Sequence, residues 1–248
     1  MHIMNELLKQ KINFLKELGI DTMEVQVTNL GDWSIKLFDG RMKQEILNAN
    51  DDTLKYFQIG DEIVIDSDLN EIIYDCPIKR SAISFHQCDD AVRVILYNIL
   101  INVISKLGAI NTITFVGGEM YIFGVVLNKY YENASFYSNF ESLIQDTCKN
   151  VTNPNVNLVD YNKDDICFGD SDMMICNLSK SDFTQNLCSC ILKSNIPKIL
   201  VISCNVKGFD SVYDMMKCKY FRLDTIIDSS GSNNIDVSLL VYHQYVKN

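Results

Sequence analysis

The sequence predicts an α/β protein whose main domain contains a Rossmann-like, seven-stranded sheet that ends in an antiparallel hairpin. From about residue 112 onward, apolar runs of strand length alternate with amphipathic stretches of helical length. Such alternation indicates parallel strands joined by helices. The last two apolar runs, 221–227 and 237–242, have only a turn-rich segment between them. They are therefore expected to pair antiparallel at one edge of the sheet.

The first 78 residues are predicted to form a small β-rich region that begins with one helix. This helix covers 5–18, where apolar residues recur at helical spacing and Gly19 follows as a helix-ending glycine. Short strands are expected after it at 25–27, 33–37, 63–65 and 72–74. Asp39-Gly40 predicts a hairpin turn after the second of these strands. The last two strands flank a polar tip and predict another hairpin.

Residues 79–248 are predicted to form the α/β domain. Its first element is a long helix over 89–107, with apolar residues at every third or fourth position and Gly108 after its end. Strands are then expected at 112–116, 134–137, 156–159, 173–176, 198–203, 221–227 and 237–242. Further helices are expected at 141–149, 182–193 and 209–217.

Composition and charge narrow the possible functions. The net charge is −10 and no basic cluster exceeds Lys79-Arg80, which disfavours RNA because phosphate neutralisation supplies most of the affinity. The nine cysteines are scattered without a Cys-x-x-Cys pair, so we expect buried reduced thiols and no metal site. The start does not resemble a signal peptide, and no apolar run is long enough to cross a bilayer. The sequence therefore predicts an intracellular, cytoplasmic protein without a membrane partner.

Candidate site residues are those that follow each predicted strand, because open α/β sheets bind ligands outside the carboxyl ends of their strands. In chain order these residues are Gly117, Gly118, Glu119, Ser138, Asp160, Asn177 and Cys204. Glycines let a turn approach a ligand closely, although a plain tight turn explains the pair equally well. Asp160 has a solvated acidic turn as its alternative interpretation. Cys204 precedes a predicted helix, whose first amides would stabilise a thiolate, and a buried inert thiol is the alternative.

Three short segments resemble the RNA uridine-C5 methyltransferases that use S-adenosylmethionine. Phe85-His86-Gln87 is similar to that family's Phe-x-Gln motif, Ser203-Cys204-Asn205 to its Ser-Cys-Asn segment, and Asp236 lies where the family has its His-x-Glu base. The resemblance implies a class I methyltransferase fold with S-adenosylmethionine as cofactor. It implies cofactor contacts from Gln87, Gly117, Gly118, Glu119, Ser138, Asp160 and Asn177. By the same resemblance, Cys204 would add to C6 of the uracil and Asp236 would take the proton from C5.

Several of the family's motifs are altered in this chain. Asn177-Leu-Ser-Lys180 stands where the family has Asp-Pro-Pro-Arg, and the first glycine turn lacks the usual leading aspartate. The base is shortened by one carbon to Asp236, and a misplacement of about 1 Å is enough to cost about a hundredfold in rate. A second hypothesis is therefore a catalytically inactive protein of this fold with a structural or assembly role, for example associated with the virion of a large DNA virus.

A third hypothesis is a methyltransferase that acts on a small molecule or a protein. It needs the cofactor but not Cys204, and it suits the acidic charge better than RNA does. The N-terminal region itself carries the acidic residues Asp51, Asp52, Asp61, Glu62, Asp66 and Asp68. For this region we expect a basic protein partner rather than RNA, with binding that weakens as salt screens the charges.

Overall fold

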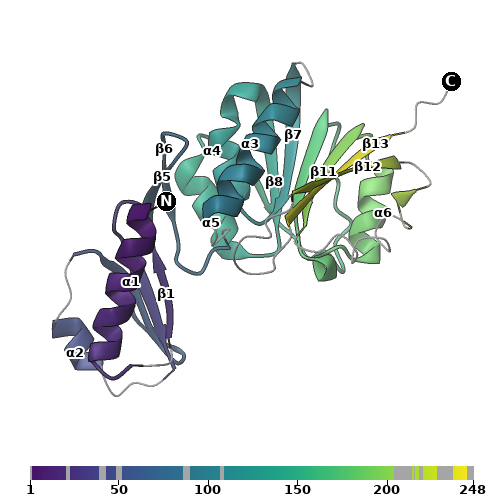
Figure 1. Cartoon of the computed structure of the whole chain (residues 1–248). Helices are drawn as coiled ribbons and strands as arrows, with labels where there is room; N and C mark the ends of the chain where they lie inside the picture. Colours follow the sequence, from purple (N-terminus) through teal and green to yellow (C-terminus); the bar gives the residue numbers. More distant parts are fainter. Residues whose placement is uncertain are drawn as a thin grey trace. The chain divides into compact units, whose positions relative to one another are not determined.

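The computed structural model describes residues 2–20, 23–38, 43–48, 52–85, 90–106, 109–203, 214, 216–217, 220–227 and 237–244. The chain divides into two compact units, residues 1–84 and 85–248, called here the N-terminal unit and the C-terminal unit (Figure 1). The predicted boundary after residue 78 lies inside strand β6 (Cys76–Arg80). Within the described ranges, no helix combines the length and the apolar character needed to span a membrane.

The N-terminal unit packs a helix against a mixed sheet. Its elements are α1 (His2–Glu17), β1 (Met23–Val27), β2 (Trp33–Leu37), α2 (Lys43–Asn48), β3 (Leu54–Ile59), β4 (Glu62–Asp66), β5 (Leu69–Ile73) and β6 (Cys76–Arg80). Strands β1 to β4 form one sheet in chain order, and β5 and β6 form a separate hairpin. The predicted first helix and first two strands are confirmed. Leu15 of α1 is fully buried in one cluster with Ile35 and Phe57 of the sheet, so the apolar side of the helix faces the sheet.

Both hairpins predicted for this unit are wrong. β2 pairs antiparallel with β1 and parallel with β3, so the chain makes a crossover that contains α2 where Asp39-Gly40 predicts a hairpin. Asp39 and Gly40 themselves lie outside the described residues. β4 pairs with β3 and β5 pairs with β6, so the runs 63–65 and 72–74 belong to different sheets. The tight turns lie at Gly60 and at Tyr74-Asp75, which have positive φ angles and join strands that are direct neighbours in the chain.

A buried ion pair joins β5 to β6 within their hairpin, and its arginine also contacts β1. Arg80 Nε donates to Glu71 Oε1 at 3.0 Å, and the two side chains are only 1% and 2% exposed. Arg80 Nη1 also donates to Gln26 Oε1 of β1 at 3.2 Å. A buried charge that loses its partner is strongly destabilising. The ion pair therefore stabilises the pairing of β5 with β6, and the hydrogen bond from Arg80 to Gln26 connects the hairpin to β1.

The C-terminal unit contains the predicted alternation of strands and helices. Its elements are α3 (Asp90–Lys106), β7 (Ile110–Gly117), α4 (Met120–Val126), η1 (Asn128–Tyr130), β8 (Tyr131–Ser138), α5 (Glu141–Asn150), β9 (Asn155–Leu158), β10 (Met173–Asn177), η2 (Lys180–Asp182), α6 (Gln185–Lys193), β11 (Lys198–Ser203), β12 (Tyr220–Ile227) and β13 (Val237–Gln244). The two η elements are short 3-10 turns. All seven predicted strands are confirmed.

The seven strands form one sheet in the order β9-β8-β7-β10-β11-β13-β12 (Figure 1). The first five in this order are parallel. β13 runs antiparallel to both of its neighbours, as the terminal hairpin predicts. The chain leaves β7 toward β8 on one side and later returns to β10 on the other side. The sheet therefore has its topological switch point between β7 and β10.

Helix α4 is not predicted from the sequence. Six of its seven residues are buried, so it has no polar side and no amphipathic period. A Cβ on Gly124 of α4 would lie 2.8 Å from the ring of Phe136, so this glycine lets the helix pack closely on the sheet. The predicted helix over 209–217 lies outside the described residues except at positions 214, 216 and 217.

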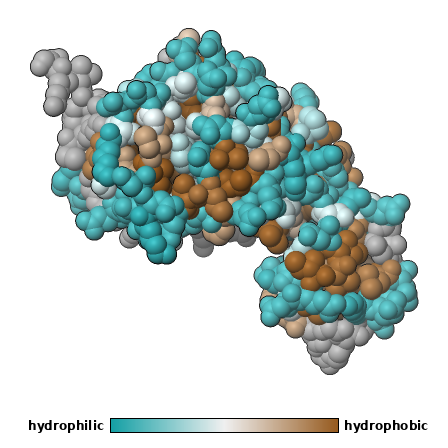
Figure 2. All heavy atoms as spheres, turned by 180° about the vertical axis from the view of Figure 1, so that it is seen from behind, coloured by the Kyte–Doolittle hydropathy of each residue, from teal (hydrophilic) through white to brown (hydrophobic). Residues whose placement is uncertain are grey.

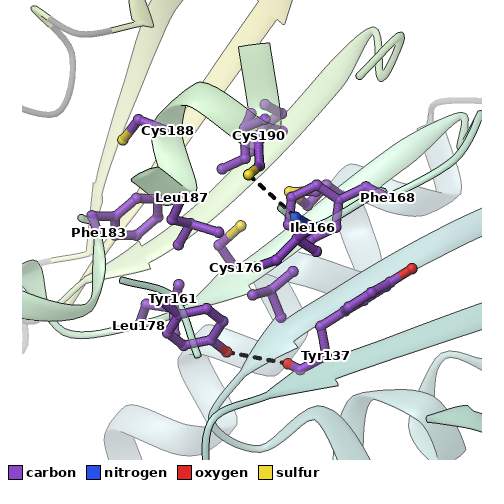
Figure 3. Packing of buried hydrophobic residues seen from close by; sticks show 14 of the residues in the cluster. Tyr137, Tyr161, Ile166, Phe168, Cys176, Leu178, Phe183, Leu187, Cys188 and Cys190 are labelled. Atoms are coloured by element: carbon purple, nitrogen blue, oxygen red, sulfur yellow. Dashed lines mark hydrogen bonds between the residues drawn. The ribbon is translucent and has the colours of Figure 1, made fainter. Parts of the chain in front are cut away.

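Helix α6 covers the opposite face of the sheet with a cluster that includes three cysteines (Figure 3). Cys176 of β10 and Cys188 and Cys190 of α6 are buried there beside Leu187 and Phe183. Burial raises the pKa of the Cys188 thiol to about 11, so this thiol is protonated near pH 7. Among the described cysteines, Cys148 and Cys167 are exposed. The expectation of buried reduced thiols is thus confirmed for Cys176, Cys188 and Cys190 and is wrong for Cys148 and Cys167.

Apolar side chains also gather at the surface of both units, between hydrophilic ones (Figure 2). In the C-terminal unit the large exposed apolar residues are Phe85, Val94, Ile95, Phe140 and Leu158. Single exposed apolar residues are common, but neighbouring ones mark places where a ligand or partner binds. Phe140 and Leu158 follow or end strands β8 and β9, at the edge of the sheet where ligands are expected.

We expect Arg80→Met to destabilise the N-terminal unit by about 3–5 kcal/mol, because it removes the guanidinium that pairs with the buried Glu71 carboxylate. Urea unfolding followed by the fluorescence of Trp33 measures this change. Trp33 is the single tryptophan and lies buried in the N-terminal unit. Lys79→Met on the same strand is the matched control and should change stability by less than about 0.5 kcal/mol. Adding Glu71→Leu to Arg80→Met should recover most of the loss. Equal unfolding midpoints for the two single variants would contradict the assignment.

Candidate functional site

The candidate site lies at the carboxyl ends of the parallel strands, around the switch point between β7 and β10. Gly117 of β7 is paired with Asn177 of β10. Gly118 and Glu119 follow β7, Ser138 ends β8, and Asp160 comes two residues after β9. Most of the predicted site residues are thus brought to one edge of the sheet. Gln87, Cys204 and Asp236 lie outside the described residues, so their predicted roles stay predictions.

The glycine turn is packed closely against its own chain. Gly117 has a φ of +90°, and a Cβ there would lie 2.4 Å from both the Asn177 carbonyl oxygen and Leu178 Cδ2. A Cβ on Gly118 would lie 2.6 Å from Cδ1 of Phe85. The Gly118 amide donates to the Asn177 carbonyl at 2.7 Å. Both glycines are therefore required by the approach of β10 and Phe85, whatever ligand the turn receives.

Glu119 turns inward and links three elements. It has a left-handed backbone conformation (φ 56°) at the start of α4, and its side chain is 1% exposed. Oε1 accepts a hydrogen bond from the Tyr97 hydroxyl of α3 at 3.0 Å, and Oε2 accepts one from Asn177 Nδ2 at 3.1 Å. Burial, and then the charge of Glu119, hold the pKa of Tyr97 well above its usual value, so Tyr97 stays a donor. Sequence reasoning did not find Tyr97, which looks like one more core residue of an apolar helix.

Ser138 lies inside the protein, whereas its neighbour Asn139 is exposed. The Ser138 hydroxyl is fully buried and accepts a hydrogen bond from the Phe140 amide at 3.1 Å. Ser138 shares a strand face with the buried Phe136, because side chains alternate along a strand. Tyr137 on the other strand face is buried as well, so alternation along β8 gives no signal that separates Asn139 from Ser138.

A pocket of about 400 Å³ opens next to Asn139 at the ends of β8 and β9. We call it the strand-end pocket; its lining includes Asn139, Leu158, Asp160, Tyr161, Asn162 and Asp182. Leu158, which is 58% exposed, and Val159 are apolar members of this lining. The pocket thus combines an apolar wall with carboxylate and amide groups, a mixture typical of small-molecule sites.

Asp160 supplies an ionised carboxylate to this pocket. Lys163, 2.8 Å from Asp160 Oδ2, and the Asn162 amide, 2.9 Å from Oδ1, hold the pKa of this exposed carboxyl below its usual value. Asp182, another residue of the pocket lining, forms a capping box with Ser179 at the start of η2. Asp160 therefore presents a charged acceptor on a turn whose shape is fixed by its own hydrogen bonds.

Comparison with known proteins supports the fold. No protein-family model matches the chain, and no curated protein matches its sequence. Among solved structures, 96% of the chain aligns with the tRNA (uracil-54, C5)-methyltransferase of Pyrococcus abyssi, solved with S-adenosyl-L-homocysteine, at a TM-score of 0.68 and 17% identity. The alignment spans 65% of that enzyme's length.

Two further structures match a smaller share of the chain at lower similarity. The N-methyltransferase NodS of Bradyrhizobium japonicum WM9 aligns over 63% of this chain and 98% of its own, with a TM-score of 0.51 and 11% identity. The ribosomal protein L11 methylase of Lactobacillus delbrueckii subsp. bulgaricus aligns over 71% and 85%, with a TM-score of 0.51 and 9% identity. The chain therefore has the class I methyltransferase fold, as its motif order predicts.

We expect Gly117→Ala to destabilise the C-terminal unit more than Gly169→Ala does. Both glycines have positive φ angles, so each substitution strains the backbone by about 1 kcal/mol or more. A methyl group at 117 also meets the Asn177 carbonyl and Leu178 at 2.4 Å, whereas one at 169 meets nothing within 4 Å. Thermal unfolding by circular dichroism measures the difference. Equal losses in the two variants would show that β7 and β10 are not held this closely.

Proposed function

We propose that this protein binds S-adenosylmethionine at the carboxyl edge of its seven-stranded sheet and is a methyltransferase. The observation that carries the proposal is the strand-end pocket, which lies at the edge where sheets of this topology bind nucleotides. The fold shared with cofactor-dependent methyltransferases supports it. When bound, the cofactor would supply an electrophilic methyl group. The protein's own residues would bind the cofactor, orient it and hold the acceptor beside it.

The residues of the strand-end pocket fit the adenosine part of this cofactor. The Asp160 carboxylate and the exposed Asn139 amide offer hydrogen bonds to ribose hydroxyls or to the adenine amino group. Leu158 and Val159 of the pocket lining offer apolar surface for the base. Ser138 is buried and bonded to Phe140, so it is not the ribose partner in this proposal. The amino-acid end of the cofactor would then point toward the glycine turn at the switch point.

For the methyl acceptor we propose a uridine base, in line with the resemblance around Cys204 and Asp236. In this scheme the Cys204 thiolate forms a bond to C6 of the uracil, and C5 becomes nucleophilic and takes the methyl group. Asp236 then accepts the proton from C5, the bond between sulfur and C6 breaks, and the thiolate is released. The structural neighbour from Pyrococcus abyssi is a tRNA (uracil-54, C5)-methyltransferase, which supports this choice.

A protein of this fold without catalysis is the second candidate. One observation favours it: the end of β8 carries a buried serine rather than a free carboxylate for the ribose. The whole-chain charge of −10 also works against an RNA substrate. This alternative predicts that neither the cofactor nor RNA binds.

Calorimetric titration with S-adenosylmethionine and S-adenosylhomocysteine tests the cofactor proposal. We expect binding with a micromolar dissociation constant. Asp160→Ala should weaken it roughly tenfold, as expected for the loss of a charge-assisted hydrogen bond. Asp170→Ala, an exposed carboxylate in the segment before β10, is the control and should leave binding unchanged. Absence of binding at millimolar ligand would favour the non-catalytic candidate.

RNA that contains 5-fluorouridine tests the proposed nucleophile. Fluorine at C5 blocks proton removal, so the covalent bond between Cys204 and C6 should persist as a slower band on a denaturing gel when S-adenosylmethionine is present. Cys204→Ala should abolish the band, and Cys148→Ala, which removes an exposed thiol, should not. A protein that binds the cofactor but forms no adduct would exclude the uridine mechanism and direct attention to small-molecule or protein substrates.

A further inference from the structure

Helix α3 has an outer side of unusual composition in addition to the apolar side that packs within the C-terminal unit. The inner side is buried at Leu96, Tyr97, Leu100 and Ile104. On the outer side, Val94 is 42% exposed and Ile95 is 40% exposed. The further exposed residues of this side are Asn98, Asn102 and Ser105. These five residues recur at spacings of three and four and so share one side of the helix, called here the α3 outer face.

The α3 outer face is uncharged over its whole length. Residues 94–105 contain no Asp, Glu, Lys or Arg, and Arg93 just before them is buried. A surface helix normally turns charged side chains toward water, whereas a helix without a charged side is normally covered on all sides. None of the helices that the structure describes, α3 included, could span a bilayer. The outer face therefore has the character of a surface that another protein covers.

A second copy of this chain suits the α3 outer face better than a partner of opposite charge. The face offers no charge to a basic or an acidic partner. Each copy carries a net charge of −10, so two copies repel each other least where the contact is uncharged. The helix begins at Asp90 and ends at Lys106, with Asn98 midway between them. Two such helices placed antiparallel about Asn98 bring the acidic start of each near the basic end of the other, and their dipoles run in opposite directions.

We propose that the α3 outer face is the interface of a two-fold symmetric homodimer, in which two α3 helices pack antiparallel about Asn98. Such self-complementary contacts are the commonest form of association between identical chains. Ile95 lies three residues before Asn98 and Asn102 four residues after it, so Ile95 of one copy lies beside Asn102 of the other. A helix of 17 residues offers a contact about 25 Å long, which is small for a stable interface. The dimer is therefore weak, and it does not depend on the proposed methyltransferase activity.

Sedimentation equilibrium of the full chain tests the dimer. We expect a dissociation constant of about 1–100 µM for the wild-type protein, in keeping with a small interface. Ile95→Lys should raise this constant roughly tenfold or more, because it places a charge in the contact without a partner. Ile83→Lys changes an apolar residue of the N-terminal unit that is 64% exposed; it is the matched control and should leave the constant unchanged. A wild-type protein that is still monomeric at about 500 µM overturns the proposal, and so does an Ile95→Lys variant that dimerises like the wild type.

A charge exchange tests the antiparallel arrangement and does not depend on Ile95→Lys alone. Asn102→Glu changes an exposed residue and should also weaken the dimer roughly tenfold or more. In the double variant, the new lysine of each copy lies beside the new glutamate of the other. The dissociation constant should then return to within about threefold of the wild-type value and rise with salt, which screens the two new pairs. A parallel pair would instead place like charges together, so a double variant that dimerises more weakly than either single variant overturns the antiparallel arrangement.

Discussion

The close approach of β7 and β10 at their carboxyl ends is the constraint on which the candidate site depends. Gly117 leaves no room for a side chain against the Asn177 carbonyl, and the Gly118 amide bonds that same carbonyl. Glu119 then takes a left-handed conformation and starts α4 at the next residue. The chain thus passes from strand to helix without a loop. The same turn brings the Glu119 carboxylate inward, where Tyr97 and Asn177 bind it.

The order of strands and helices in the C-terminal unit was predictable because short apolar runs of strand length alternate there with longer stretches of helical period. Prediction failed where that period is absent, as in α4, which is buried almost all round. It failed again in the N-terminal unit, where Asp39-Gly40 is a local turn signal. Partner choice in a sheet is decided by packing between distant segments, and β2 gains more by lying parallel to β3 under α1. A dipeptide carries no information about that packing.

The site was predictable in position but not in detail. The rule that ligands bind at strand ends selected Gly117, Gly118, Asp160 and Asn177, and these residues do lie at one edge of the sheet. The direction of each side chain depends on neighbouring residues, and the rule uses only the position of a residue at a strand end. Ser138 is buried with its hydroxyl bonded to the Phe140 amide, and the Glu119 carboxylate is bonded to Tyr97 and Asn177. Tyr97 meets Glu119 across 22 residues of sequence, which no local pattern records.

This arrangement gives a physical reason for the altered motif at the end of β10. The uridine-C5 family has an aspartate where this chain has Asn177, which from the sequence reads as the loss of a carboxylate. In the structure Glu119, which follows β7, supplies a carboxylate next to position 177. Its Oε2 lies 3.1 Å from Asn177 Nδ2. An aspartate at 177 would put two carboxylates in contact in a buried setting, where one of them would have to be protonated. Asparagine and Glu119 are therefore a matched pair. The altered residue at the end of β10 thus follows from the inward carboxylate of Glu119, because an amide can donate to that carboxylate and a second carboxylate cannot.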